Sequence, residues 1–319
     1  MPSAGFGNAR GGGGVSSMTA RQDRLRDFKH RAEYILIRIG SLALRALPLD
    51  VARPLLGRLF SLVAPWTKLH RRAAANIAAA LPELAAAEHR RILSLMWRNT
   101  GAVVAEMAMV DRTLADPHRL EIIGDGPLRQ RLKEPGSQIG VTFHFGNWEL
   151  AGWAAEQCGC KLAAIYRPLR NPYLDRYLYS IREGLYPRGL LFKGRDSTAR
   201  QLVSYFRKGP IGLVCDQSDE TAEFTVPFFA HAAKFTPAPA LLARRLDASV
   251  WLMRCSRVGH SGRFCFELKE LCIPRTDSAD EDVRAATAAM ARQFEAWIRE
   301  TPEQWMWWQR RSIGSPLGT

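Results

Sequence analysis

The chain has 319 residues, of which 47% are hydrophobic and 24% charged, and these values exclude disorder as its general state. The formal net charge is +14, and residues 1–75 contribute +9 of it through 13 Lys and Arg against 4 Asp and Glu. Such a balance indicates a polyanionic partner, either nucleic acid or an anionic membrane surface. The six cysteines lie in apolar surroundings without a disulfide-framework spacing, so we expect reduced packing residues and a cytoplasmic body.

The first residues, MPSAGFGNARGGGGVSSM, are small and rich in glycine, with almost no apolar bulk. We predict a flexible tail over residues 1–20. No apolar stretch follows this segment closely, so it does not fit a secretory signal peptide.

Residues 21–70 read as two amphipathic helices. Arg31, Arg38 and Arg45 recur every seven residues, which keeps them near one side of a helix, and Pro48 is expected to end it. The residues between these arginines are mostly large and aliphatic. The stretch LDVARPLLGRLFSLVAPW then gives a second apolar segment.

This N-terminal region has two open interpretations. Its longest charge-free run, Leu59–Thr67, is far shorter than the roughly 20 residues that span a bilayer. A helical membrane-associating segment at the lipid interface, with arginines among lipid phosphates, fits the pattern. The alternative is a pair of core helices with solvated arginines. No nucleic acid partner is expected, because the basic residues alternate with aliphatic side chains and not with aromatic ones.

Residues 71–319 are predicted to form one catalytic domain. Helical patterns fill residues 70–110, and short β-type runs then alternate with helices. The expected strands are Ile139–Phe143, Leu162–Tyr166, Ile211–Cys215, Ser249–Cys255 and Arg263–Leu271. The expected helices are Trp148–Cys158, Tyr173–Glu183, Thr198–Lys208, Pro237–Leu246 and Asp280–Glu300. This alternation predicts an α/β fold with a mixed, mostly parallel sheet flanked by helices.

The stretch VTFHFGNWELAGW places chemistry at the end of the first of these strands. His144 and Glu149 are five residues apart, so on one helix they would point about 140° away from each other. They can meet if His144 sits on the turn after the strand, Gly146 supplies the bend and Asn147 caps the next helix. We therefore expect Glu149 to orient His144 as a general base.

Other interpretations of this stretch stay open. His144 could be a buried histidine bonded to backbone, with Glu149 only capping the helix. No metal is expected, since neither His118 nor His231 supplies a nearby third zinc ligand. No motif for a serine or cysteine nucleophile accompanies the pair, which favours direct acyl transfer to a substrate hydroxyl.

The stretch HFGNWE resembles the H-x4-D/E motif of glycerolipid-type acyltransferases, and more particularly that of the lipid A late acyltransferase family. Four further blocks resemble that family in the same order along the chain. They are IYRPLRNPYLD (165–175), RDSTARQLVSYFRKGPIGLVCDQ (195–217), VPFFAHAAKFTPAPALLAR (226–244) and PEQWMWWQRR (302–311). Two departures are visible. Ala230 replaces the usual glycine of VPFFG, which could narrow an acyl groove, and Gln309 replaces the histidine of the terminal motif, so that histidine cannot be required here.

The resemblance implies an acyltransferase that moves a fatty acyl chain from acyl carrier protein to a hydroxyl of a Kdo-lipid A precursor. It implies a site at the cytoplasmic face of the cell inner membrane and no cofactor, because the donor is a thioester. His144 and Glu149 would be catalytic, while Arg167, Arg170, Arg195 and Asp216 would bind substrate. Acyl carrier protein is acidic and the glycolipid acceptor carries phosphates, and both suit a +14 chain.

Other functions remain compatible with the sequence. The acceptor could be another membrane glycolipid, such as a phosphatidylinositol mannoside or an ornithine-type lipid, with acyl-CoA as the donor in the mannoside case. The chain could instead be a catalytically silent membrane scaffold, or a hydrolase whose base activates water.

Overall fold

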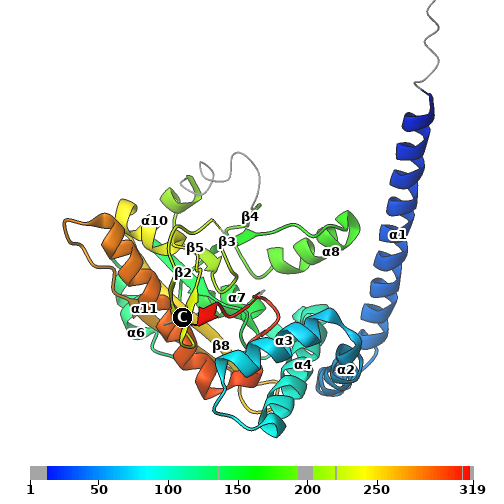
Figure 1. The fold of residues 1–319 in the computed structure, drawn as a ribbon, viewed down its shortest axis with the longest axis horizontal. Helices are drawn as coiled ribbons and strands as arrows, with labels where there is room; N and C mark the ends of the chain where they lie inside the picture. The colour runs from blue at the N-terminus through cyan, green and yellow to red at the C-terminus, as the bar shows by residue number, and fades with distance from the viewer. Residues whose placement is uncertain (1–12, 135–136, 193–203, 220, 311, 317–319) are drawn as a thin grey trace, which may run out of the picture.

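The computed structural model of this chain describes residues 13–134, 137–192, 204–219, 221–310 and 312–316. A group of N-terminal helices precedes an α/β body (Figure 1). The group comprises α1 (Gly13–Arg45), α2 (Leu49–Val63), α3 (Lys68–Ala80) and α4 (Ala86–Ala108). The first helix starts inside the segment that we expected to be a tail. It ends shortly before Pro48, as predicted, and Pro48 is the N-cap residue of α2.

The body is built on a seven-stranded sheet in the order β1-β9-β8-β2-β5-β3-β4. All neighbouring strands run parallel except β8 and β9, so the predicted mixed, mostly parallel sheet is confirmed. The strands are β1 (Leu120–Ile123), β2 (Gln138–Thr142), β3 (Ala163–Tyr166), β4 (Leu190–Phe192), β5 (Ile211–Val214), β8 (Ser249–Arg257) and β9 (Phe264–Leu271). All five predicted strands are present. Of the strands in this sheet, only the short edge strands β1 and β4 were not predicted.

Further helices lie on the two faces of the sheet or beside it. They are α5 (Val110–Leu114), α6 (Gly126–Arg131), α7 (Ala151–Gln157), α8 (Pro172–Glu183), α10 (Ala238–Leu246) and α11 (Ala279–Glu300). Val250 and Leu252 of β8 share a core with α11, whereas Trp251 and Met253 share a core with α7. Because successive strand residues point to opposite faces, α11 and α7 lie on opposite sides of the sheet. The helix expected over residues 198–208 lies largely outside the described residues.

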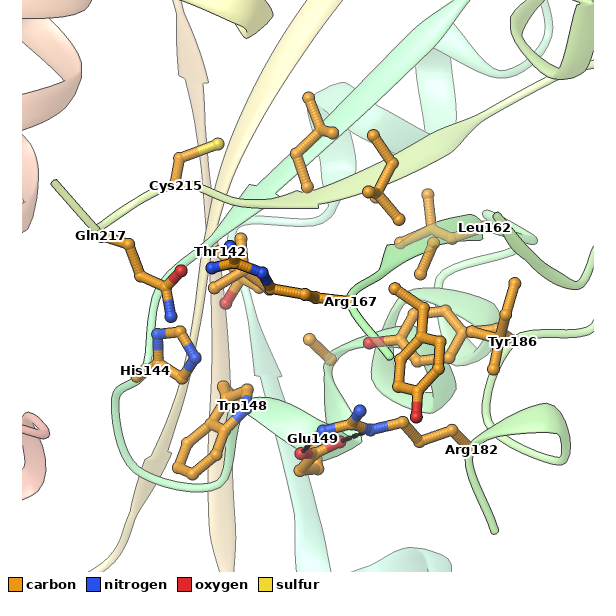
Figure 2. Close-up of a pocket in the computed structure, with 18 of the residues that line it drawn as sticks. Thr142, His144, Trp148, Glu149, Leu162, Arg167, Arg182, Tyr186, Cys215 and Gln217 are labelled. Carbon is orange, nitrogen blue, oxygen red and sulfur yellow. Dashed lines mark hydrogen bonds and ion pairs between the residues drawn. The ribbon is translucent and has the colours of Figure 1, made fainter. Parts of the chain in front are cut away.

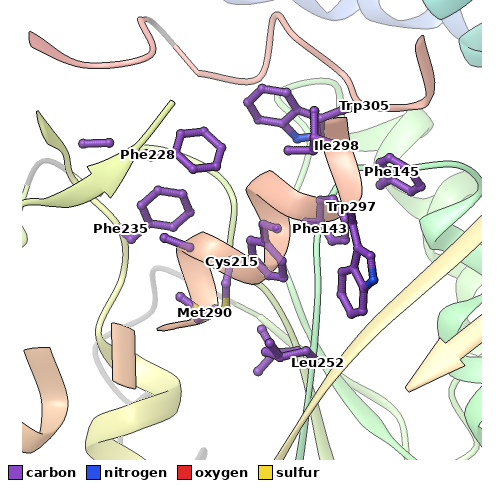
Figure 3. Packing of buried hydrophobic residues seen from close by; sticks show 14 of the residues in the cluster. Phe143, Phe145, Cys215, Phe228, Phe235, Leu252, Met290, Trp297, Ile298 and Trp305 are labelled. Carbon is purple, nitrogen blue, oxygen red and sulfur yellow. The ribbon is translucent and has the colours of Figure 1, made fainter. Parts of the chain in front are cut away.

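The predicted core face of the last helix is confirmed. Its apolar stripe is buried, and Phe143 stacks on Phe294 and Trp297 of α11 (Figure 3). Ser278 caps the helix by accepting from the backbone N–H of Glu281. A small antiparallel sheet of β6 (Val226–Phe228), β7 (His231–Ala233) and β10 (Ser315–Pro316) lies beside this core.

The second helix combines a tightly packed face with an exposed apolar face. A Cβ atom on Gly101 of α4 would lie 2.4 Å from the carbonyl oxygen of Leu56, so glycine permits the close approach of α2 and α4. The opposite face of α2 exposes large apolar side chains: Val51, Leu55, Leu59, Leu62 and Val63. Within the described residues, we find no helix with both the length and the apolarity needed to cross a bilayer.

Helix α8 projects beside the body and meets α1 (Figure 1). None of its residues is buried. Asn171 caps its start by accepting from the backbone N–H groups of Tyr173 and Leu174. Polar contacts join the two helices: the Tyr173 hydroxyl donates to Asp27, and the hydroxyls of Ser41 and Tyr177 lie 2.9 Å apart.

Candidate active site

At the end of strand β2 and in the residues that follow it, side chains point alternately into the core and into a pocket. Phe143 is fully buried against α11, whereas Thr142 and His144 line the pocket on the other side of the chain. Gly146 then turns the backbone with a φ of +57°. A Cβ atom at this position would lie 2.0 Å from the carbonyl oxygen of Cys255, so the predicted glycine bend is confirmed and has a steric reason.

His144 is hydrogen-bonded to Asp216, which follows strand β5. The distance from His144 Nδ1 to Asp216 Oδ1 is 2.7 Å. Strands β2 and β5 pair in parallel with Thr142 opposite Val214. Two residues beyond that pair, His144 and Asp216 therefore come together at the carboxyl ends of adjacent strands, where open α/β sheets place their ligands.

The Asp216 carboxylate is buried and fully engaged. Its Oδ2 accepts from the backbone N–H of His144 at 3.0 Å and from Trp305 Nε1 at 2.8 Å. Burial alone would raise the pKa of Asp216, but the attraction of His144 and these hydrogen bonds hold that pKa below its ordinary value. Since an ionised carboxylate only accepts, Nδ1 of His144 carries the proton and Nε2 presents its lone pair.

Glu149 does not orient His144, contrary to our expectation. Both of its carboxylate oxygens accept from Arg182 of α8, with Arg182 Nε 2.8 Å from Oε2. Glu149 belongs to the short 3₁₀ turn Trp148–Leu150 and lines the same pocket as His144. The prediction that both residues lie close together is confirmed in that they line one pocket. The carboxylate that contacts the imidazole, however, is Asp216, which follows the neighbouring strand.

Asn147 also differs from expectation. It makes no side-chain cap to the following turn, and its Nδ2 instead donates to Glu106 Oε2 of α4 at 2.8 Å. Glu106 in turn forms a buried ion pair with Arg257 of β8. From the same helix, Asn99 Nδ2 donates to the carbonyl oxygen of Gly146 at 3.0 Å. The loop after β2 is thus bonded to α4 on one side.

The C-terminal segment bonds the same loop from another side. The backbone N–H of Met306 donates to the carbonyl oxygen of His144, and that of Gly146 donates to the carbonyl oxygen of Gln304. Trp305 is fully buried against Phe228 and Phe229 (Figure 3). Residues 304–306 therefore position both the histidine loop and its carboxylate.

The pocket has a volume of about 670 Å³. Figure 2 shows His144 and Trp148 on one side of it and Arg182 and Tyr186 on the other, with Arg167, which directly follows β3, reaching in between them. The rest of the lining is largely apolar: Leu162, Ala164, Leu190, Leu213 and Met253. Such a cavity combines an imidazole with room for an apolar chain.

A family model described as bacterial lipid A biosynthesis acyltransferase matches residues 21–312. This chain belongs to that family. A lipid A biosynthesis acyltransferase of Haemophilus influenzae is 24% identical over 272 residues, which cover 83% of each chain. The lipid A biosynthesis lauroyltransferase of Escherichia coli is 26% identical over 76% of this chain and 78% of its own. A phosphatidylinositol mannoside acyltransferase of Mycolicibacterium smegmatis is 26% identical over 51% of this chain and 52% of its own.

The remaining predicted substrate-binding residues of this acyltransferase have different placements. Arg167 lines the pocket and is exposed to solvent. Arg170 is exposed too, but it does not belong to the lining of this pocket as far as the described residues define it. Arg195 lies outside the described residues. Asp216 contacts His144, and its backbone carbonyl accepts from Arg310 Nη1 at 2.9 Å.

The two departures from the family motifs also have structural positions. Ala230 is exposed in the β6–β7 turn with a φ of +57°, so the glycine usually found there suits the backbone, and Ala230 does not narrow the pocket. Gln309 accepts through Oε1 from Gln217 Nε2 at 3.1 Å, beside the pocket lining. Among the described residues, no cluster of His, Cys, Asp or Glu side chains suits a metal ion.

The contacts of several residues that support the site were not predicted from the sequence. Glu106, Asn99 and Arg257 support the histidine loop, yet they come from α4 and β8 and carry no motif. Trp305 lies in the terminal block PEQWMWWQRR, so its position was noted but its contact with Asp216 was not. Contacts between segments this distant in the chain leave no periodic signal.

Proposed function

We propose that this acyltransferase moves a fatty acyl chain from acyl carrier protein to a hydroxyl of a Kdo-lipid A precursor, with His144 as the general base. The observation that carries the proposal is the 2.7 Å contact between His144 and Asp216 at a pocket whose remaining walls are largely apolar. Asp216 fixes the tautomer that leaves Nε2 available to the pocket. The apolar part of the pocket suits an acyl chain.

In the proposed reaction, His144 Nε2 takes the proton of the acceptor hydroxyl as its oxygen attacks the thioester carbon. Asp216 stabilises the imidazolium that forms. The tetrahedral intermediate then collapses, the carbon–sulfur bond breaks, and the leaving thiolate takes the proton from Nε2. The energy of the thioester drives the transfer, so the proposed chemistry calls for no cofactor.

Positive charge supports the proposed partners. The net charge of +14 favours encounters with an acidic carrier protein and with a phosphorylated glycolipid. Arg167, an exposed residue of the pocket lining, is suited to bind a phosphate of the acceptor through its forked donors. We assign the same role to Arg170 and Arg195 from the family resemblance alone.

The N-terminal helices support a proposed location at the cytoplasmic face of the inner membrane. Most of the exposed large apolar side chains lie on α1, on α2 and just after α2, and Trp66 is 80% exposed. Basic residues such as Arg58 and Lys68 are exposed among them. In our proposal residues 21–70 lie in the lipid interface and residues 71–319 carry the catalysis.

The test uses purified protein, acyl carrier proteins bearing C10 to C16 chains, and Kdo-lipid IVA in mixed micelles. Mass spectrometry should detect the gain of one acyl group on the lipid with wild-type protein and none with His144→Ala. His118→Ala changes an exposed histidine outside the pocket and should react like wild type. If His144→Ala formed as much acylated lipid as wild type, the assignment of His144 as the general base would be wrong.

The relative from Mycolicibacterium smegmatis favours one alternative acceptor. That relative is named as a phosphatidylinositol mannoside acyltransferase, and it matches half of this chain. A competition between acyl carrier protein and acyl-CoA donors, with both lipid acceptors present, separates the two functions. Preferential acylation of the mannoside would replace the lipid A assignment.

A further inference from the structure

Thr142 carries a buried hydroxyl that has no partner. The residue is 4% exposed, and its Oγ1 forms no hydrogen bond with any part of the chain that the structure describes. Buried side-chain oxygens are nearly always hydrogen-bonded, so an exception calls for an explanation. Of the unpartnered buried atoms in the described residues, Thr142 Oγ1 is the one whose residue lines the pocket.

Thr142 and His144 face the same space. Phe143 between them points into the core, where it stacks on Phe294 at a centroid distance of 4.4 Å. Alternate residues of an extended chain share a side and lie about 6.6 Å apart. Figure 2 shows Thr142 and His144 on the same side of the pocket, near the end of strand β2.

This spacing suits two simultaneous contacts at one reacting carbonyl group: one to the attacking hydroxyl and one to the carbonyl oxygen. A hydroxyl nucleophile lies about 2.8 Å from its base, and an oxyanion lies about 2.8 Å from its donor. The carbon–oxygen bonds of the tetrahedral centre fit between these two contacts. A base and a donor about two extended residues apart can therefore act on the same carbonyl group.

We propose that the Thr142 hydroxyl donates a hydrogen bond to the oxygen of the acyl carbonyl and stabilises the negative charge that develops there. The proposal rests on the proposed acyl transfer. As the acceptor oxygen bonds to the carbonyl carbon, the π electron pair moves to the carbonyl oxygen, which accepts from Thr142 Oγ1. When the carbon–sulfur bond breaks, the carbonyl re-forms, and Thr142 keeps its proton throughout.

The decisive variant is Thr142→Val, which removes the hydroxyl and keeps the shape. We expect kcat to fall roughly 100-fold while KM changes little, because the bond strengthens in the transition state. Thr142→Ser keeps a hydroxyl and should retain most of the activity. The thermal midpoint of Thr142→Val should equal or exceed that of wild type, because an unpartnered hydroxyl is replaced by a methyl group.

Thr287→Val is the matched control. Thr287 is buried in α11, but its hydroxyl donates to the carbonyl oxygen of Val283 at 2.7 Å and it lies outside the pocket lining. This control should lose stability and keep kcat, which is the opposite of the pattern expected for Thr142→Val.

The kinetic assay measures consumption of the acyl thioester, so it detects turnover with any acceptor, including water. Wild-type kcat in Thr142→Val, or a rise in KM alone, would overturn the role of Thr142. Retained turnover in His144→Ala would instead overturn the proposed base, whatever Thr142→Val does. Should Thr142→Val not fold, Thr142→Ala is measured against Thr142→Ser, and equal kcat values would reject the proposal.

Discussion

The two sides of the pocket are built differently. On one side, His144 and Asp216 follow strands β2 and β5. The core residues next to them are buried against α11 and Trp305. On the other side, α8 has no buried residue and reaches the pocket through the ion pair of Arg182 with Glu149. It is held further by Tyr166, whose hydroxyl donates to Asp175.

This difference separates two roles that were predicted jointly from the H-x4-E spacing. General-base catalysis requires that the base be positioned within fractions of an ångström, and the buried residues on the sheet side provide that positioning. A wall that has no fully buried residue can be displaced at lower cost than one built into the core. Glu149 therefore pairs with α8, while Asp216 contacts His144, the proposed base.

The largest expected effect comes from Asp216→Asn. An asparagine cannot hold the imidazole in the required tautomer through an ionised oxygen, so we expect kcat to fall roughly 10²- to 10⁴-fold. The exposed Asp280→Asn on α11 is the control and should leave kcat unchanged. Steady-state rates of thioester consumption measure both, and a nearly active Asp216→Asn would contradict the assignment of the sheet side.

A smaller effect is expected from Trp305→Phe. This variant keeps a ring in the aromatic cluster but removes the N–H that donates to Asp216, and we expect kcat to fall about 10-fold. Because the carboxylate loses a donor that lowers its pKa, the pKa of Asp216 should rise, and we expect the acid limb of the rate profile to move to higher pH.

Trp307→Phe provides the matched control for that variant. Trp307 is equally buried and lies 4.7 Å from Trp305 between ring centroids, but its Nε1 donates to the carbonyl oxygen of Pro302. It should lose similar stability without moving the pH profile. Identical pH profiles for the two variants would mean that Trp305 only packs.

The α8 side is tested by a double-mutant cycle on Glu149→Gln and Arg182→Met. These side chains are 9% and 21% exposed, and we expect a coupling of about 1–3 kcal/mol in the free energy of unfolding. A parallel cycle on Glu149→Gln and His144→Ala should give a coupling near zero. Chemical denaturation measures both cycles, and the reverse order would restore Glu149 as the partner of His144.

The smallest effect concerns stability in acid. Because the pKa of Asp216 is lowered in the folded state, its carboxylate stabilises the fold above the unfolded value of about 3.9. That contribution is lost as the pH falls through the folded value. We expect the free energy of unfolding to decline below about pH 4, and less steeply in Asp216→Asn. Asp111, whose pKa is lowered by a hydrogen bond from Arg45, should preserve part of the slope.

Local patterns predicted the body of the fold well. Apolar runs located the five principal strands, and the stripe of the last helix identified its core face, because burial repeats with the period of each element. The strands β4, β6, β7 and β10 have only two or three residues and show no such period. The fold of the candidate site was predictable to the level of His144, its glycine bend and its place after a strand.

The partner of His144 was not predictable from the same patterns. Asp216 is 72 residues away in the chain, and the two meet only because β2 and β5 are neighbours. Strand order is set by packing of the whole sheet, which one sequence does not display. Glu149 was the nearer carboxylate, and proximity in sequence favoured it over the correct one.

The position of Trp305 bears on the order in which the protein acquires its activity. A ribosome completes β2 and β5 well before it makes the tryptophan that donates to Asp216, 89 residues after that carboxylate. Until the last segment has been synthesised and has folded back, the histidine loop lacks its bonds to Gln304 and Met306. A nascent chain therefore contains His144 and Asp216 before the hydrogen bonds from residues 304–306 that position them can form.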